Sequence, residues 1–243
     1  MVKETESDRR IGQRYDRLAE RYDQSRFGGP FGEFHAENML RLIDWLLPAT
    51  LKPCKVLDVA AGTGIAALRL AKKGHAVTAI DISEPMVRLG QAKARSSSLP
   101  VTFVAGNARS LPYPDEHFDL LVSVMFLYLD WSHEDRVVFM NEMRRVLKPG
   151  GLLVLEVLNP LWGPLVEWYQ QFLEERRHTK STRRQTAELI AGFRVLGKGA
   201  CNYPKLSWVH KISVPFARFL ARMGRYPPLR WVGLERYLLL QKL

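Results

Sequence analysis

Hydrophobic positions recur with helical spacing over the first fifth of the chain. Between residues 9 and 47, apolar side chains return every three to four residues, and a Gly-Gly-Pro sequence at 28–30 interrupts the run once. This pattern predicts two consecutive helices before the first strand.

From residue 55 onward, short apolar runs alternate with segments of helical periodicity. Strands are expected at 55–60, 75–80, 101–105, 118–124 and 152–157, and helices at 65–73, 85–96 and 133–147. Ser132, with Asp135 three residues later, suits the N-cap of the last of these helices. Regular alternation of this length predicts an α/β fold, a parallel sheet with helices on both faces.

The regular alternation of strands and helices ends after Asn159. Helices are expected at 165–177 and 182–190, and strands at 194–198 and 236–241. Residues 200–234, rich in aromatic and basic side chains, have no place in this pattern. The length favours a single domain. We expect it to contain a helical lid (1–47), a core (48–199 and 235–243) and a substrate-side insertion (200–234).

The composition, 47% hydrophobic and 25% charged, is that of an ordinary globular protein. No apolar run approaches eighteen residues, and the N-terminus lacks the apolar core of a secretory signal. Two cysteines form no disulfide framework, and no Cys/His spacing suggests a metal. A cytoplasmic protein without metal is expected.

A glycine-rich turn follows the first predicted strand, in the sequence VLDVAAGTG at 56–64. Its small residues let the backbone approach a ligand closely. Asp81, at the end of the next strand, is placed to accept hydrogen bonds from both hydroxyls of a ribose. Because Gly62, Gly64 and Ala67 also fit the dinucleotide fingerprint, this signal alone leaves the nucleotide open.

Two features favour S-adenosylmethionine (SAM) over a dinucleotide. Asp58 lies four residues before Gly62, where its carboxylate attracts the cationic SAM and repels a pyrophosphate. The chain also has no Tyr-x-x-x-Lys pair of the kind used by short reductases.

Four segments then stand in order: VLDVAAGTG, the acid of AIDIS, LPYPDEHFDLL and RVLKPGGLLVLEV. Together they resemble the class I SAM-dependent methyltransferases, in particular the small-molecule group that includes the ubiquinone/menaquinone methyltransferases. The resemblance covers about residues 10–160, and the C-terminal third only loosely. It implies a Rossmann-like, mostly parallel seven-stranded sheet and methyl transfer that leaves S-adenosylhomocysteine (SAH).

The resemblance also implies cofactor contacts from the loops that follow the strands and from the lid. These are Asp58, Ala60, Gly62 and Gly64 at the methionine part, Asp81 at the ribose, Ile82, Met86, Asn107 and Ala108 around the adenine, Val124 closing the pocket, and Tyr15 and Tyr22 in the lid. Relatives often have Gly at position 60 and Asp at position 107. Alanine is still small, and an amide oxygen still accepts a hydrogen bond.

The acceptor side carries weaker signals. A general base is needed only if the nucleophile begins protonated, and the candidates are His35 and His133. Residues 124–127, Val-Met-Phe-Leu, replace the Asn/Asp-Pro-Pro-Tyr/Phe motif of methylases that act on nucleic-acid bases. The expected acceptor is therefore a small, lipophilic or aromatic molecule.

The basic charge is concentrated late in the chain. Residues 176–243 contain 15 Lys and Arg against two Glu. An RNA methyltransferase that grips phosphates is the alternative function, and a SAM-binding partner without catalysis is a third. Within this region, residues 213–224 have the pattern of a basic amphipathic helix, which could contact an anionic membrane peripherally or pack on the sheet with its arginines solvated.

Overall fold

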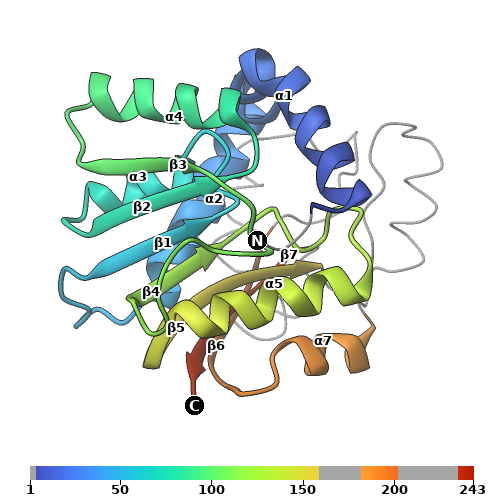
Figure 1. The fold of residues 1–243 in the computed structure, drawn as a ribbon. Coiled ribbons are helices and arrows are strands. Elements are labelled where there is room, and N and C mark those ends of the chain that lie inside the picture. The colour runs from blue at the N-terminus through green and yellow to red at the C-terminus, as the bar shows by residue number, and fades with distance from the viewer. Residues whose placement is uncertain (1–3, 159–181, 202–234) are drawn as a thin grey trace, which may run out of the picture.

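A computed structural model describes residues 4–158, 182–201 and 235–243 of the chain (Figure 1). The helices are α1 (Glu6–Phe27), α2 (Gly29–Leu46), α3 (Ile65–Ala71), α4 (Glu84–Ser96), α5 (His133–Val146) and α7 (Arg183–Leu189). The strands are β1 (Lys55–Val59), β2 (Ala76–Asp81), β3 (Val101–Ala105), β4 (Phe118–Ser123), β5 (Leu147–Leu158), β6 (Phe193–Cys201) and β7 (Glu235–Lys242). Each of these elements was predicted from the sequence.

β5 and β6 are longer than the sequence predicted by four residues or more, and β7 by one residue at each end. β5 begins at Leu147 because this residue pairs with Phe118 across a register shift, ahead of the predicted start at 152. β6 continues to Cys201, paired with Glu235 of β7, so its last two residues belong to the sheet and not to the expected insertion. The predicted helix at 165–177 and residues 202–234 lie outside the described residues.

The strands form one sheet in the order β3-β2-β1-β4-β5-β7-β6. β1 to β5 pair in parallel, and β7 is antiparallel to both β5 and β6. The mostly parallel seven-stranded sheet is thereby confirmed. Because the chain proceeds outward from β1 to β3 and then returns to β4, the order reverses between β1 and β4. Ligands of open α/β sheets bind outside the carboxyl ends of the strands at such a point.

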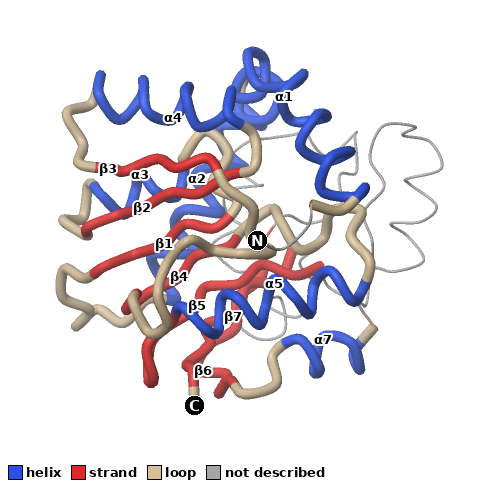
Figure 2. The backbone as a smooth tube through the Cα atoms, in the orientation of Figure 1, coloured by secondary structure: helices blue, strands red, loops and turns tan. Residues whose placement is uncertain are grey.

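Helices cover both faces of the sheet (Figure 2). On one face α2, α3 and α4 pack against side chains such as Val56, Leu120 and Val154. On the other, α5 and α7 pack against the alternate side chains, such as Leu57 and Leu121. The near-continuous apolar strands of the sequence are explained by burial on both faces.

Helix α1 begins at a capping box, in which Thr5 and Asp8 each accept from the other's backbone N–H. Arg109, in the loop after β3, donates to Asp8 at 2.9 Å and to Asp135 of α5 at 2.7 Å. Asp8 is fully buried. This buried ion-pair network holds the start of α1, the first helix of the predicted lid, against the rest of the domain.

Candidate functional site

A cavity lies at the carboxyl ends of β1, β2 and β4, where the strand order reverses, and α1 forms its outer wall. The space between its walls is about 650 Å³, which includes open solvent at the mouth. Its lining residues are Ile11, Tyr15, Tyr22, Phe27, Asp58, Ala60, Ala61, Gly62, Thr63, Ile65, Ala66, Asp81, Ile82, Val124, Met125, Phe126, Leu129 and Trp131.

The turn after β1 has three residues in the left-handed backbone region: Ala60 (φ 59°), Gly62 (φ 55°) and Gly64 (φ 84°). A Cβ added to Gly62 would meet no atom within 4 Å, because the space beside it belongs to the cavity. A Cβ on Gly64 would stand 2.4 Å from the Phe103 ring. One glycine therefore leaves room for a ligand, and the other lets the turn pack on the core.

Asp81 holds this turn in place from the neighbouring strand. Its two carboxylate oxygens accept from the Gly62 N–H at 2.7 Å and from the Ser83 N–H at 2.9 Å. A carboxylate has about four lone-pair sites, so each oxygen can still accept a further hydrogen bond from a ligand.

Asp58 is the second acid of the cavity and is 1% exposed. It accepts from the Ala67 N–H at 3.0 Å. Burial first, and then the charge of Asp81, raise its pKa to about 7. Among the described residues, no Lys or Arg forms an ion pair with either acid. The cavity is thus suited to a ligand that carries positive charge and hydroxyl groups.

Two aspartates of α1 attach this helix to the loops below it. Asp16 accepts from the Ser83 hydroxyl at 2.6 Å, and Asp23 accepts from the Thr63 hydroxyl at 2.6 Å. Lys93 of α4 forms an ion pair with Asp23. Each aspartate directly follows a predicted lid tyrosine, and both tyrosines line the cavity.

Eight of the predicted cofactor residues come together in this cavity: Tyr15, Tyr22, Asp58, Ala60, Gly62, Asp81, Ile82 and Val124. Four others do not line it. Met86 is fully buried, Gly64 packs on the core, and the Asn107 side chain accepts from the Arg109 N–H at 2.9 Å. Ala108 packs against the sheet face covered by α5.

Neither predicted base reaches the cavity. His35 of α2 is buried and stacks on the Phe27 ring, with 6.4 Å between ring centroids. His133 starts α5 and pairs with Glu188 of α7 at 2.9 Å, away from the cavity. The described residues contain no group of three His, Cys, Asp or Glu that could hold a metal.

The sequence did not single out several apolar wall residues, although it predicted an apolar pocket after the fourth strand. Phe27, Leu129 and Trp131 contribute from α1 and from the loop between β4 and α5. Their hydrophobicity is the only sequence signal they carry, and core residues share it. Leu127, from the predicted apolar tetrapeptide, belongs to the core instead.

Comparison with known proteins agrees with this geometry. Residues 56–151 match the family model described as a methyltransferase domain. A ubiquinone/menaquinone biosynthesis C-methyltransferase of Bordetella avium is 43% identical over 129 residues, covering 50% of this chain and 49% of the relative. Its counterpart in Psychromonas ingrahamii is 40% identical over 121 residues, which is 47% of each chain. Residues 56–151 therefore form a methyltransferase domain, and the chain resembles the class I SAM-dependent methyltransferases.

Solved structures match this methyltransferase fold over more of the chain. Magnesium protoporphyrin IX methyltransferase from Synechocystis, with bound SAH, has a TM-score of 0.72 at 15% identity and covers 98% of this chain and 100% of its own. A SAM-dependent methyltransferase from Methanosarcina mazei has a TM-score of 0.63 at 24% identity, covering 83% and 97%. At these low sequence identities, the similarity between this chain and the solved structures concerns the fold alone. The chain spans about half the length of the curated relatives it matches.

Proposed function

We propose that the protein binds SAM in this cavity and transfers its methyl group to a small lipophilic acceptor. The observation that carries the proposal is the pair of acids at the point where the strand order reverses: Asp58 is buried, Asp81 is partly exposed, and neither has a cationic partner in the described part of the chain. A ligand with an ammonium, a sulfonium and a ribose complements them, whereas a pyrophosphate would be repelled.

The residues around the cavity fit this cofactor. Asp58 would attract the methionyl ammonium, and Asp81 would accept from both ribose hydroxyls. Gly62 leaves space for the ligand, and Ile82 would flank the adenine. Four predicted cofactor contacts do not line the cavity: Gly64, Met86, Asn107 and Ala108. They would support the cavity wall from behind, or reach the cofactor after their loops rearrange.

The acceptor would lie against the apolar wall that follows β4. Met125, Phe126, Leu129 and Trp131 supply this wall, and their aromatic and apolar surfaces suit a flat hydrophobic ring. The relatives named above are C-methyltransferases of ubiquinone/menaquinone biosynthesis. We therefore infer a quinol-type ring as the acceptor and a ring carbon as the methylated atom.

Little chemistry is required of the protein, since SAM brings the activated methyl group. The chain would hold the acceptor atom close to and in line with the sulfur–methyl bond, which can lower the barrier by several kcal/mol. The apolar wall and α1 would limit the access of water to the reacting atoms. His35 is one aromatic ring away from the cavity and could contribute only if Phe27 moved, and the pairing of His133 with Glu188 argues against its use as a base.

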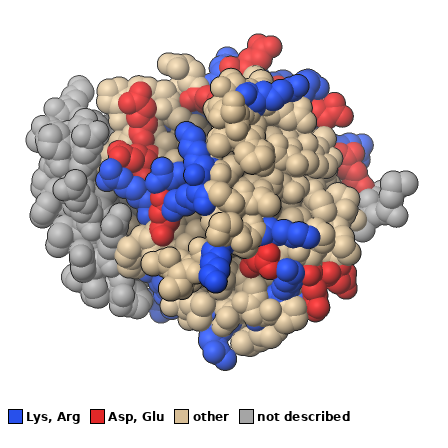
Figure 3. Space-filling view, turned by 90° about the vertical axis from the view of Figure 1, so that its left-hand side faces the viewer, with Lys and Arg blue, Asp and Glu red and all other residues tan. Residues whose placement is uncertain are grey.

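The RNA alternative gains no support from the relatives, whose names refer to small molecules. On the face shown in Figure 3, Lys and Arg lie among Asp and Glu and form no continuous basic surface. Among the described helices, none is long and apolar enough to cross a membrane. Peripheral contact with an anionic membrane would depend on residues 213–224, which lie outside the described residues.

Two measurements test the proposal. SAM and SAH should raise the melting temperature while NAD and NADP do not, because a ligand that binds only the native state stabilises it by mass action. Purified protein with SAM and 1,4-dihydroxynaphthalene, a hydroquinone with free ring carbons, should then yield SAH and a C-methylated product. Equal stabilisation by NAD would reject the cofactor, and a protein that binds SAM but methylates no hydroquinone would reject the acceptor.

A further inference from the structure

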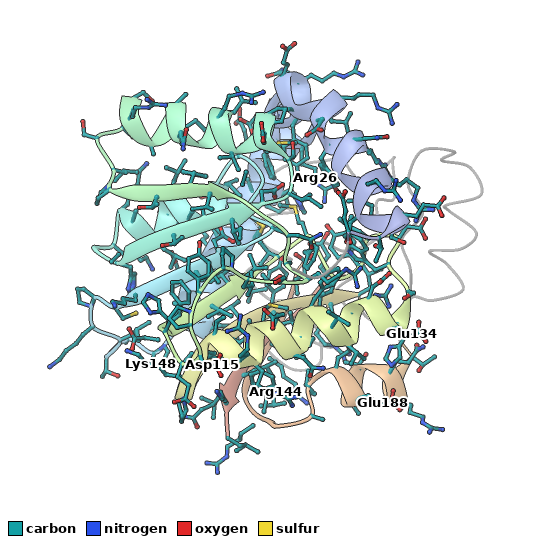
Figure 4. All side chains as sticks on the ribbon, in the orientation of Figure 1. Arg26, Asp115, Glu134, Arg144, Lys148 and Glu188 are labelled. Atoms are coloured by element: carbon teal, nitrogen blue, oxygen red, sulfur yellow. The ribbon has the colours of Figure 1, made fainter. Side chains whose placement is uncertain are left out.

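Arg26 lies beside the apolar wall of the cavity. It occupies the last turn of α1, next to Phe27 and four residues after Tyr22, and both of these side chains line the cavity. Its Nη2 lies 3.5 Å from the sulfur of Met125, a further wall residue, and donates to the Tyr128 hydroxyl at 3.2 Å. The side chain is half-buried on the sheet side of α1 (Figure 4).

The guanidinium has donors to spare. An arginine carries five N–H donors and remains charged, and the hydrogen bonds of Arg26 within the described part of the chain all come from Nη2. No carboxylate of the described residues forms an ion pair with it, in contrast to Arg109, which pairs with two. Glu156 of β5 and Glu235 of β7 lie close enough to act on its charge. Arg26 can therefore bind another negative oxygen.

Glu156 is completely buried behind the same wall. Its Oε2 accepts from the Met125 N–H at 2.7 Å and so holds Met125 in the left-handed region, at φ 56°. The Tyr237 hydroxyl is near enough to favour the charged form of Glu156. In the described ranges, however, no donor meets the Oε1 atom of Glu156 with hydrogen-bond geometry. Burial first, and then the charge of Glu235, raise the pKa of Glu156 well above its usual range. Glu156 therefore keeps its proton to a higher pH than an exposed carboxyl would, and while protonated it neutralises none of the Arg26 charge.

We propose that Arg26 binds an ionisable hydroxyl oxygen of the acceptor and stabilises this oxygen as an oxyanion. The inference rests on the proposed methyl transfer and defines its substrate class. The acceptor is a hydroquinone or an enol, in which ionising the oxygen makes the conjugated carbon nucleophilic.

The step balances without a further reactant. The hydroxyl proton moves to water at the open side of the cavity, and the guanidinium stabilises the oxyanion. An electron pair of the ring carbon forms the bond to the methyl group, while the two electrons of the sulfur–methyl bond remain on sulfur. The ring carbon then loses its hydrogen as a proton to water, and the oxygen recovers a proton from water.

The test compares Arg26→Met and Arg26→Lys with Arg21→Met, a control at an exposed arginine of the same helix. Methylation of 1,4-dihydroxynaphthalene is measured anaerobically. Loss of one donor to a developing oxyanion typically lowers kcat by about 100- to 1,000-fold, and we expect this of Arg26→Met. Arg26→Lys should recover part of the rate, and Arg21→Met should match the wild type. The Kd for SAH should remain within about twofold in all three variants, because Arg26 acts on the acceptor.

The pH profile separates this role from a merely structural one. In Arg26→Met the residual rate should keep rising towards pH 10, near the pKa of about 10 of an unassisted phenol, whereas the wild type should level off at lower pH. The inference is refuted if Arg26→Met loses SAH binding as strongly as turnover. It is also refuted if Arg26→Met keeps the full rate of methylation.

Binding to the SAH complex gives an answer that does not depend on turnover. The wild type should bind 1,4-dihydroxynaphthalene at least about tenfold more tightly than 1,4-dimethoxynaphthalene, and Arg26→Met should abolish this preference. If the wild type shows the preference without turnover, the proposed acceptor fails while the role of Arg26 stands. If the wild type binds both compounds equally, the inference is wrong even where methylation occurs.

Discussion

Replacing Asp58 by Asn should stabilise the free protein and weaken its cofactor site at the same time. The pKa of this buried carboxyl is raised from 3.8 to about 7. The folded protein therefore keeps a proton that the unfolded chain releases, so stability falls as the pH rises through this window. Asn retains an oxygen that can accept from the Ala67 N–H, and it removes the buried charge.

The size of the effect follows from the pKa difference. A difference of about three pKa units corresponds to a cost of about 4 kcal/mol at pH 8 and less than half of that at pH 5. Asp58→Asn should therefore raise the free energy of unfolding by up to about 4 kcal/mol at pH 8. The gain should shrink as the pH is lowered.

The effect on the ligand has the opposite sign. An ammonium beside Asp58 favours the ionised carboxylate, so below pH 7 binding must also release a proton. The Kd of the wild type for SAH should rise about 25-fold between pH 7.5 and pH 5.5. Asp58→Asn should bind SAH about 10- to 100-fold more weakly at pH 7.5 and show little of this pH dependence.

Calorimetric titration with SAH and urea unfolding at several pH values measure both effects. Asp115→Asn, at a position whose side chain is 74% exposed, serves as the matched control and should change neither. A wild-type Kd that is flat from pH 5.5 to 7.5 would refute the reasoning. So would an Asn variant that keeps the wild-type slope or is less stable than the wild type at pH 8.

Three further predictions concern other parts of the chain. Asp81→Ala should weaken SAM binding about 10- to 100-fold in a titration, through lost charge-assisted hydrogen bonds, and an unchanged Kd would remove this acid from the site. Gly90→Ala should lower the melting temperature by several degrees, because its Cβ would stand 2.3 Å from a core aromatic ring, and an unchanged value would show that the ring can move. Changing Arg218, Arg222 and Arg225 together to Gln should abolish sedimentation of the protein with anionic vesicles and leave SAM binding intact. If the wild-type protein does not sediment with such vesicles, the membrane contact is excluded.

Most of the fold could be predicted from the sequence, because local patterns encode it. Apolar runs with helical segments between them specify strands and crossovers, and parallel pairing follows from their alternation. The turn at 60–64 and the acid at the end of β2 were recognisable as well, since each needs a particular residue type at a fixed distance from a strand. The lengths of β5 and β6 could not be predicted from the sequence, because strand length depends on pairing with distant strands.

The tertiary structure alone decided which side chains meet. Periodicity places a residue on a helix, but it does not say which helix crosses the cavity or which ring faces it. Arg26, Glu156 and Glu235 are far apart in the sequence, and only the packing of α1, β5 and β7 brings them together behind the wall. The same packing buries Asp58 and raises its pKa, because the cost of a buried charge depends on what surrounds it. The sequence by itself therefore determined the fold and the glycine-rich turn after β1, whereas the apolar side of the cavity follows from long-range contacts.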